Sequence, residues 1–330
     1  MECLDEILER AKTQGRLLIV SHINSDPDAV ASSLVLGYIA TMHGVKPLYC
    51  MDGVSKVSRK IVEALGITFT RDPVDESGLP LIICDTPSLE LLGECSRYIE
   101  ESPFVCVIDH HSPGSLRKYA HRYVVEREPA TSVIVGDAAY RYMDRLPHSY
   151  ATLLITGILF DTRRLSLASP KTFHVLEKLV RDGDYTLARR LLEEEPPYPE
   201  RVARLKGAAR AEIVDVCGYL IAITWVSAYE ASVARALISL GADVAIVVGG
   251  HKKNIRISIR LSQRALEKGL RGDIILRRVA ERLGGEGGGH AAASGYNLKA
   301  TSTREGRVLR DKAGKSVLIE AVREALDSLC

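Results

Sequence analysis

Acidic and histidine side chains follow four separate apolar segments of this chain. They are His22, Asp26, Asp28, Asp85, Asp109, His110, His111 and Asp161. Several carboxylates gathered in one place repel one another unless cations lie between them. Carboxylate oxygens with some imidazole nitrogen and no thiolate suit Mn²⁺ or Mg²⁺ better than Zn²⁺ or Co²⁺. Two ions that share a carboxylate are the standard arrangement for displacement at phosphorus, so these residues indicate metal-dependent phosphoester hydrolysis.

The segments that precede these side chains predict how they are brought together. Residues 17–20, 79–84 and 104–108 are apolar runs typical of buried parallel strands, and residues 149–160 have a helical pattern. Because the carboxyl ends of parallel strands meet at one edge of a sheet, we expect the side chains to lie at that edge. Taken singly, the residues have plainer interpretations: the acids of 21–28 as helix caps, and Asp85 as a cap before a helix at Pro87.

The other elements predict an α/β fold with two domains. A parallel-sheet catalytic domain is expected over residues 1–182, a partly helical linker over 183–210, and a second, smaller α/β domain over 211–330, across a cleft. The first domain has predicted helices at 28–43, 57–65, 130–145, 149–160 and 170–181, another after Pro87, and a short strand at 47–51. The second has predicted strands at 218–226, 242–248 and 254–261 and helices at 229–240, 273–283 and 315–329.

The second domain carries a possible anion site. Arg256, Ser258 and Arg260 alternate with isoleucines and therefore share one strand face. A glycine run that includes Gly288 and Gly289 ends in His290, and its backbone N–H groups could approach a phosphate. The plainer interpretations are an exposed basic strand face and a surface loop.

Composition limits the partners. The chain has 330 residues, a formal net charge of +2 and 46% hydrophobic residues, so a broad basic track for long nucleic acid is not indicated. Its seven cysteines form no C-x-x-C pair, and we expect them to be small core residues in a reducing cytoplasm. The chain shows no signal peptide pattern and no apolar stretch near the roughly 18–20 residues of a membrane span, so we expect a cytoplasmic protein without a membrane partner.

These motifs together resemble those of a known family. The series H-x-x-x-D-x-D-A from His22, an aspartate after a strand at Asp85, D-H-H at 109–111 and G-I-x-x-D-T at 157–162 is similar to the four motifs of the DHH phosphoesterases. R-I-S-I-R and G-G-G-H resemble the DHH-associated C-terminal domain of the nanoRNase and RecJ-like branch. Ser25, Pro27 and Ala31 depart from common family residues, which affects the shape of the loop and not the set of ligands.

The resemblance implies roles for the site residues. One Mn²⁺ would be held by His22, Asp26 and Asp85, and a second by Asp28, Asp85, His110 and Asp161, with Mg²⁺ or Co²⁺ as alternatives. Asp109 would orient His110, His111 would contact the phosphate or assist the leaving oxygen, and a hydroxide bridging the ions would attack phosphorus. Substrate phosphate would be bound by Arg256, Ser258, Arg260, Gly288, Gly289 and His290.

The expected function is that of a Mn²⁺-dependent phosphodiesterase or exonuclease on short oligonucleotides, similar to nanoRNases, with 3′-phosphoadenosine 5′-phosphate as a further substrate. A cyclic or linear dinucleotide phosphodiesterase is the alternative within enzymes. An inactive nucleotide-binding interaction module is the alternative of another class, although no ligand position is missing. Binding of long duplexes is not expected, and a homodimer remains open.

Overall fold

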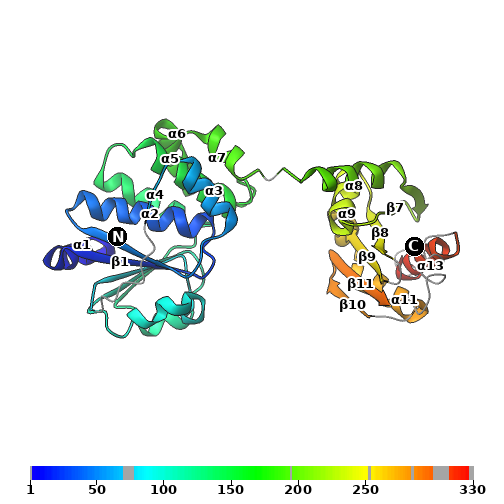
Figure 1. Cartoon of the computed structure of the whole chain (residues 1–330), viewed down its shortest axis with the longest axis horizontal. Coiled ribbons are helices and arrows are strands. Elements are labelled where there is room, and N and C mark those ends of the chain that lie inside the picture. Colours follow the sequence, from blue (N-terminus) through cyan, green and yellow to red (C-terminus); the bar gives the residue numbers. More distant parts are fainter. Residues whose placement is uncertain are drawn as a thin grey trace. The chain divides into compact units, whose positions relative to one another are not determined.

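The computed structural model describes residues 2–69, 78–193, 195–251, 254–283, 286–299 and 312–326. They form two compact units, Met1–Glu194 and Glu195–Cys330, and Figure 1 shows the elements of each. Within the described residues, no helix is both long enough and apolar enough to cross a membrane.

The N-terminal unit is built on a five-stranded parallel sheet in the order β2-β1-β3-β4-β5. The strands are β1 (Arg16–Ser21), β2 (Lys46–Met51), β3 (Leu81–Cys84), β4 (Val105–Asp109) and β5 (Arg122–Val125). The sequence predicted the first four of these strands and missed β5. β1 lies between β2 and β3, so the order of strands reverses beside it, and a sheet of this kind binds ligands at the carboxyl ends around that point.

Helices cover one face of this sheet and short 3-10 segments cover the other. Leu17 and Ile19 of β1 pack with the α-helices, while Leu18 and Val20 pack on the opposite face. Burial on both faces explains the unbroken apolar run. The helices are α1 (Glu2–Gln14), α2 (Pro27–Met42), α3 (Lys56–Ala64), α4 (Thr131–Tyr142), α5 (His148–Asp161), α6 (Pro170–Asp182) and α7 (Tyr185–Leu191), and the 3-10 segments are η1 (Leu89–Tyr98) and η2 (Ser115–Lys118).

Two features of this unit differ from the sequence prediction. The helix expected after Pro87 is the 3-10 segment η1, which kinks at Gly93, where an added Cβ would lie 2.2 Å from Oδ2 of Asp52. The cysteines are not all thiols: disulfides join Cys3 to Cys106 and Cys50 to Cys95, and Cys84 stays free and buried.

The prediction of reduced core cysteines is therefore wrong for these four residues. The partners are 103 and 45 residues apart in the chain, and only packing of α1 against β4 and of η1 against β2 brings them together. Disulfides persist in oxidising compartments and in intracellular proteins of hyperthermophiles, so the cysteines no longer argue for a reducing compartment.

The C-terminal unit has a six-stranded mixed sheet in the order β10-β11-β9-β8-β7-β6. Its strands are β6 (Glu212–Val216), β7 (Tyr219–Trp225), β8 (Val244–His251), β9 (Asn254–Leu261), β10 (Glu286–His290) and β11 (Ala293–Lys299). The helices α8 (Tyr198–Ala209) and α9 (Glu230–Ser239) lie on one face. α10 (Gln263–Glu267), α11 (Gly272–Leu283) and α13 (Lys312–Leu326) lie on the other.

Two segments have more regular secondary structure than the sequence predicted. Within residues 183–210, expected as a partly helical linker, α7 packs on α5 of the N-terminal unit and α8 packs on α9 of the C-terminal unit. One plainer interpretation of the glycine run was a surface loop. From Glu286 to His290 the run instead forms β10, an edge strand that pairs antiparallel with β11. Residues 284 and 285 lie outside the described part of the chain. The loop interpretation is therefore wrong for residues 286–290.

Candidate active site

The loop after β1 presents His22 and Asp26 from a rigid turn. Asp26 is the N-cap of α2, and its Oδ1 accepts hydrogen bonds from the backbone N–H groups of Asp28 at 2.9 Å and Ala29 at 3.0 Å. The capping interpretation is thus correct for Asp26 and leaves its carboxylate at the site. Nδ1 of His22 donates to the backbone oxygen of Ile23 at 2.8 Å, so Nε2 is the nitrogen that faces Asp26, at 3.9 Å.

Asp85 lies at the end of β3 and faces two different imidazoles. Its Oδ2 is 3.9 Å from Nε2 of His22, and its Oδ1 is 3.5 Å from Nε2 of His110. Asp85 has a backbone φ of 55°, a left-handed conformation that a non-glycine residue adopts at some energetic cost and that is common at functional sites. It is not a helix cap, because Ser88 occupies that position before η1. Its geometry is that of a carboxylate shared between two sites.

His110 directs one ring nitrogen into the acidic cluster. Its Nδ1 donates to the backbone oxygen of Glu128 at 3.2 Å, which leaves Nε2 facing Asp161 Oδ2 at 3.3 Å. Nε2 is buried and makes no hydrogen bond to any described residue. The contact at Nδ1 therefore holds Nε2 next to carboxylate oxygens without a hydrogen bond of its own to a described residue. This is the arrangement expected of a histidine that binds a metal ion.

Three groups of described residues could hold divalent cations. Two of them share no residue, and the third, Asp85, Asp109, His110 and His111, overlaps both. In each group the candidate ligand atoms lie within 4.8 Å of one another. The first group is His22, Asp26 and Asp85, and the second is Asp28, His110 and Asp161. Oxygen ligands predominate over nitrogen and no thiolate takes part, a donor set suited to Mn²⁺ or Mg²⁺. The family resemblance implies the same two sets with Asp85 added to the second, and the role of these residues as metal ligands stays a prediction.

Electrostatics also favours cations at this point. Burial, followed by the charge of Asp161, raises the pKa of Asp28 to about 7. Burial and then the charge of Asp28 likewise raise the pKa of Asp85. Burial alone would lower the pKa of His110, but the neighbouring Asp161, the charge of Asp28 and the backbone oxygen of Glu128 together more than offset this and raise it. The carboxylates thus crowd like charge into a buried space, which bound cations would neutralise.

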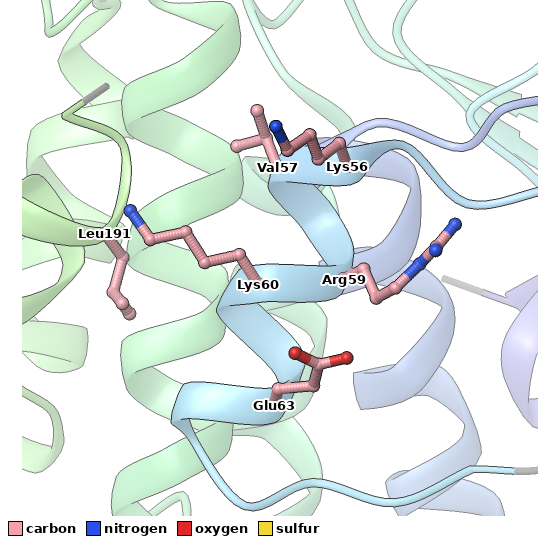
Figure 2. Close-up of a pocket in the computed structure, with 6 residues that line it drawn as sticks. All are labelled: Lys56, Val57, Arg59, Lys60, Glu63 and Leu191. Carbon is pink, nitrogen blue, oxygen red and sulfur yellow. The ribbon is translucent and has the colours of Figure 1, made fainter. Parts of the chain in front are cut away.

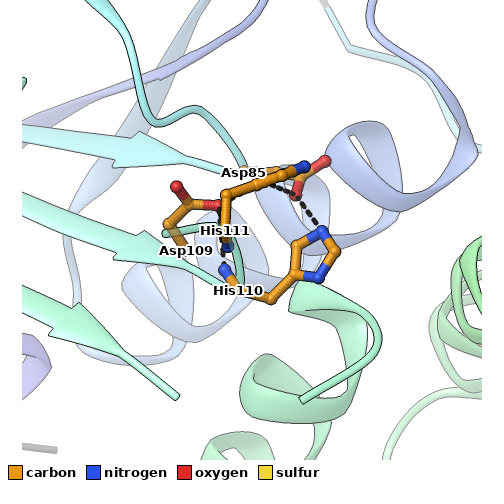
Figure 3. Close-up of side chains that lie close together, drawn as sticks. All are labelled: Asp85, Asp109, His110 and His111. Carbon is orange, nitrogen blue, oxygen red and sulfur yellow. Dashed lines mark hydrogen bonds and ion pairs between the residues drawn. The ribbon is translucent and has the colours of Figure 1, made fainter. Parts of the chain in front are cut away.

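Asp109 is paired with His111 and not with the ring of His110. Its Oδ1 accepts hydrogen bonds from the backbone N–H groups of His110 at 2.8 Å and His111 at 3.2 Å, and from Nδ1 of His111 at 2.8 Å (Figure 3). The side chain of His111 is 46% exposed. The predicted role of Asp109 in orienting His110 is corrected here: Asp109 orients the imidazole of His111, and Glu128 orients that of His110.

The sequence did not predict the contribution of the first turn of α4 and of α5. The backbone N–H groups of Thr131 and Ser132 donate to the two oxygens of Asp28 at 2.6 and 2.8 Å, and Oγ1 of Thr131 donates to Oδ1 of Asp85 at 2.8 Å. Gly157 makes room for them, since an added Cβ would lie 2.2 Å from Oγ of Ser132. The one available signal was the start of a predicted helix near 130, where N–H groups are free to bind an anion.

The predicted substrate-binding residues lie mainly on one face of the C-terminal sheet. Register pairs Arg260 with Ala293 and Ala293 with His290, and it pairs Ser258 with Gly295 and Gly295 with Gly288. Residues directly opposite each other share a face, so Arg256, Ser258, Arg260, Gly288 and His290 point the same way, while Gly289 alternates. Gly288 and Gly295 lie in the same cross-strand row as Ser258, between the rows that contain Arg256 and Arg260. Nothing lies within 4 Å of a Cβ built on either glycine, so the backbone there is open.

Arg256 has a partner that the sequence did not indicate. Its Nη2 lies 2.9 Å and its Nε 3.1 Å from Oε1 of Glu230, the first residue of α9. The guanidinium side chain remains 53% exposed. Glu230 fits there because Gly249 of β8 has no side chain; a Cβ would lie 2.1 Å from the Glu230 carboxylate. The pair holds Arg256 in place without removing it from the surface.

A separate hollow beside α3 holds none of the predicted residues. It measures about 250 Å³ and is lined by Lys56, Val57, Arg59, Lys60, Glu63 and Leu191 (Figure 2). Lys60 reaches toward Leu191 and Arg59 extends away from it. The cations do not converge and no group of metal ligands is present among the lining residues, so this hollow is not the active site.

Known proteins match the chain along most of its length. Residues 16–158 match the DHH family, N-terminal domain, and residues 228–324 match the DHHA1 domain. The uncharacterized protein MJ0988 of Methanocaldococcus jannaschii is 32% identical over 318 residues, covering 95% of this chain and 94% of that protein. The bifunctional oligoribonuclease and PAP phosphatase NrnA of Thermus thermophilus is 28% identical over 342 residues, covering 99% and 94%.

A solved structure shares the fold. The exopolyphosphatase-related protein of Bacteroides fragilis superposes with a TM-score of 0.53 at 18% identity, covering 98% of this chain and 97% of that one. At that identity the similarity concerns the fold alone.

Proposed function

Because the chain belongs to the DHH family of metal-dependent phosphoesterases, we propose that it is a Mn²⁺-dependent phosphodiesterase that removes nucleotides from short oligonucleotides. The observation that carries the proposal is the position of Asp85, whose two oxygens face His22 and His110 from the two ligand groups. A carboxylate placed in this way can bridge two ions.

The ligand groups would hold the ions as the family resemblance implies. His22, Asp26 and Asp85 would hold one, and Asp28, Asp85, His110 and Asp161 the other. Bound divalent ions would supply an activated water and stabilise the negative charge that develops on the phosphoryl oxygens.

His111 would act on the substrate from beside the ligand groups. Because Nδ1 is bonded to Asp109, Nε2 is the nitrogen that remains available on this exposed ring. From that position His111 can contact a phosphate oxygen or give a proton to the leaving oxygen, while Asp109 fixes the orientation of the ring.

The part of the C-terminal sheet that is left open around Gly288 and Gly295 would bind the non-reacting part of the substrate. Arg256 and Arg260 can bind a phosphate with paired N–H groups. The open backbone at Gly288 and Gly295 allows close approach, and His290 lies in the same cross-strand row as Arg260. These residues would select for a short chain with a terminal phosphate.

The names of two relatives support the short-oligonucleotide assignment. Besides the protein of Thermus thermophilus, a probable bifunctional oligoribonuclease and PAP phosphatase of Streptococcus mutans is 26% identical over 209 residues. We therefore include 3′-phosphoadenosine 5′-phosphate as a second substrate. A dinucleotide phosphodiesterase uses the same ligand groups and remains the alternative. The complete ligand set argues against an inactive binding module.

Product analysis tests this proposal. The full chain with Mn²⁺ is given 5′-labelled RNA and DNA from dinucleotides to decanucleotides, together with cyclic dinucleotides and 3′-phosphoadenosine 5′-phosphate. We expect fastest release of mononucleotide from the shortest oligonucleotides. Equal cleavage of long strands would overturn the proposal, and activity confined to dinucleotides would favour the alternative.

A further inference from the structure

We propose that Thr131 is a positioning residue that sets the spacing between two predicted metal-binding carboxylates, Asp28 and Asp85. The inference depends on the proposed function only in requiring that the site bind divalent ions.

One residue makes a hydrogen bond to each carboxylate. The backbone N–H of Thr131 donates to Oδ2 of Asp28 at 2.6 Å, and its Oγ1 donates to Oδ1 of Asp85 at 2.8 Å. All three side chains are buried, with exposures of 0% for Thr131, 0% for Asp28 and 2% for Asp85. The two donors are separated by a single torsion, χ1 of one β-branched residue, which has few allowed rotamers. Together they therefore restrict the distance between two acids that would otherwise repel.

Helix α4 keeps this residue in place. Ser132 donates its backbone N–H to Oδ1 of Asp28 at 2.8 Å, so Asp28 receives two N–H groups from the first turn, where the helix dipole favours a negative charge. The hydroxyl of Thr131 is not used for capping, because the N-cap is Ala130 and no side-chain capping bond is present. Helix stability therefore does not explain the contact between Thr131 and Asp85.

The contact should affect the two ion sites unequally. Thr131 binds Oδ1 of Asp85, the oxygen that faces His110, whereas Oδ2 faces His22. Without the hydroxyl of Thr131, the carboxylate of Asp85 can rotate, and its Oδ1 is no longer held facing His110. The ion held with Asp28, His110 and Asp161 should weaken more than the ion held with His22 and Asp26.

Substitution of Thr131 separates its two donors. Thr131→Val removes the hydroxyl at nearly constant volume and keeps the backbone bond to Asp28, while Thr131→Ser keeps both donors. Thr131→Ala removes the same hydroxyl and replaces the valine variant if that one does not fold. A matched control is Thr224→Val, which removes an equally buried hydroxyl, bonded to the backbone oxygen of Gly207, from the C-terminal unit.

Calorimetric titration of Mn²⁺ into the metal-free full chain is the test. We expect Thr131→Val to weaken one of two binding events by about 10–100-fold, the usual effect of losing a contact behind a metal ligand. The other event should change little, and Thr131→Ser and Thr224→Val should resemble the wild type. Equal weakening of both events, or unchanged binding in Thr131→Val, would overturn the inference.

The result is separable from the fate of the proposed function. Normal oligonucleotide hydrolysis with unchanged Mn²⁺ binding in Thr131→Val rejects the role of Thr131 alone. Unequal weakening in a protein whose wild type does not hydrolyse oligonucleotides rejects the proposed substrate and supports the role of Thr131.

Discussion

Oδ1 of Asp109 accepts a hydrogen bond from Nδ1 of His111 at 2.8 Å, and this pair lies directly beside the acidic cluster. His111 is also 3.9 Å from Oδ1 of Asp85 through the same nitrogen. Asp109 therefore fixes the orientation of the exposed imidazole of His111 next to the proposed metal ligands. A contribution of His111 to proton transfer should then depend on Asp109.

Replacing His111 with Asn should lower kcat by about 10²–10⁴-fold, the usual contribution of a positioned acid or base. Asp109→Asn should produce part of the same loss, because an amide oxygen can still accept the hydrogen bond from His111 but holds the imidazole less firmly than a carboxylate does. The two substitutions combined should cost little more than His111→Asn alone. Steady-state kinetics on a dinucleotide, together with Mn²⁺ titration, provides the check, and additive losses would contradict the pairing.

Asp85→Asn should abolish hydrolysis while the fold persists. The variant loses the charge that both ions would share, and Thr131 can still donate to the remaining carbonyl oxygen. In the absence of metal its thermal midpoint should be equal to or above that of the wild type, because a buried carboxylate has been removed from a crowded group. Mn²⁺-dependent turnover in this variant would contradict the assignment of Asp85.

The acidic cluster should make the metal-free protein less stable as the pH rises. Burial and the charge of Asp161 raise the pKa of Asp28 to about 7, whereas an unfolded chain titrates this group near about 3.9. The folded state therefore holds a proton that the unfolded state has lost, and the contribution is present below about pH 4 and lost as the pH rises through about 7.

Thermal midpoints of the wild type and of Asp28→Asn test this point without metal. The wild type should lose stability relative to the variant between about pH 4 and about pH 7. Saturating Mn²⁺ should reverse the trend for the wild type, because cations neutralise the carboxylates as protons leave. A difference that does not change with pH would be evidence against like-charge crowding at Asp28.

Gly157→Ala should disturb the site through Ser132 and Asp28, which lie against Gly157. The new Cβ would lie 2.2 Å from Oγ of Ser132 and 3.0 Å from Oδ1 of Asp28, so the side chains of Ser132 and Asp28 must shift. We expect a loss of about 1–3 kcal/mol in the free energy of unfolding, as for other overpacked positions, and weaker Mn²⁺ binding. Gly288→Ala is the control for stability, since nothing lies within 4 Å of its added Cβ; denaturant titration measures both.

Arg256→Ala and Arg260→Ala should raise KM by roughly tenfold or more each, because a hydrogen-bonded contact to a charged group contributes about 1.5–3 kcal/mol. The value of kcat should change far less, since these residues would bind a part of the substrate that does not react. Arg278→Ala is the matched control, because Arg278 is a half-exposed arginine with its own acidic partner, Glu281. An unchanged KM in both β9 variants would remove this face from the proposed substrate site.

The sequence by itself determined the α/β class, the motifs that identify the family, and which side chains gather at the ends of β1, β3 and β4. It could do so because a buried parallel strand has a local pattern and its carboxyl end lies at a known edge of the sheet. The alternation in β9 likewise predicted a shared face for Arg256, Ser258 and Arg260 from local information alone.

Only the tertiary structure decided how these side chains are held. Thr131 meets Asp28 across 103 positions and Asp85 across 46, Glu128 meets His110 across 18, and Arg256 meets Glu230 across 26. The disulfides and the pairing of β10 with β11 are of the same kind. Such contacts depend on how whole helices and strands pack against one another. The sequence around a hydroxyl or a backbone N–H does not indicate which distant carboxylate it will bind.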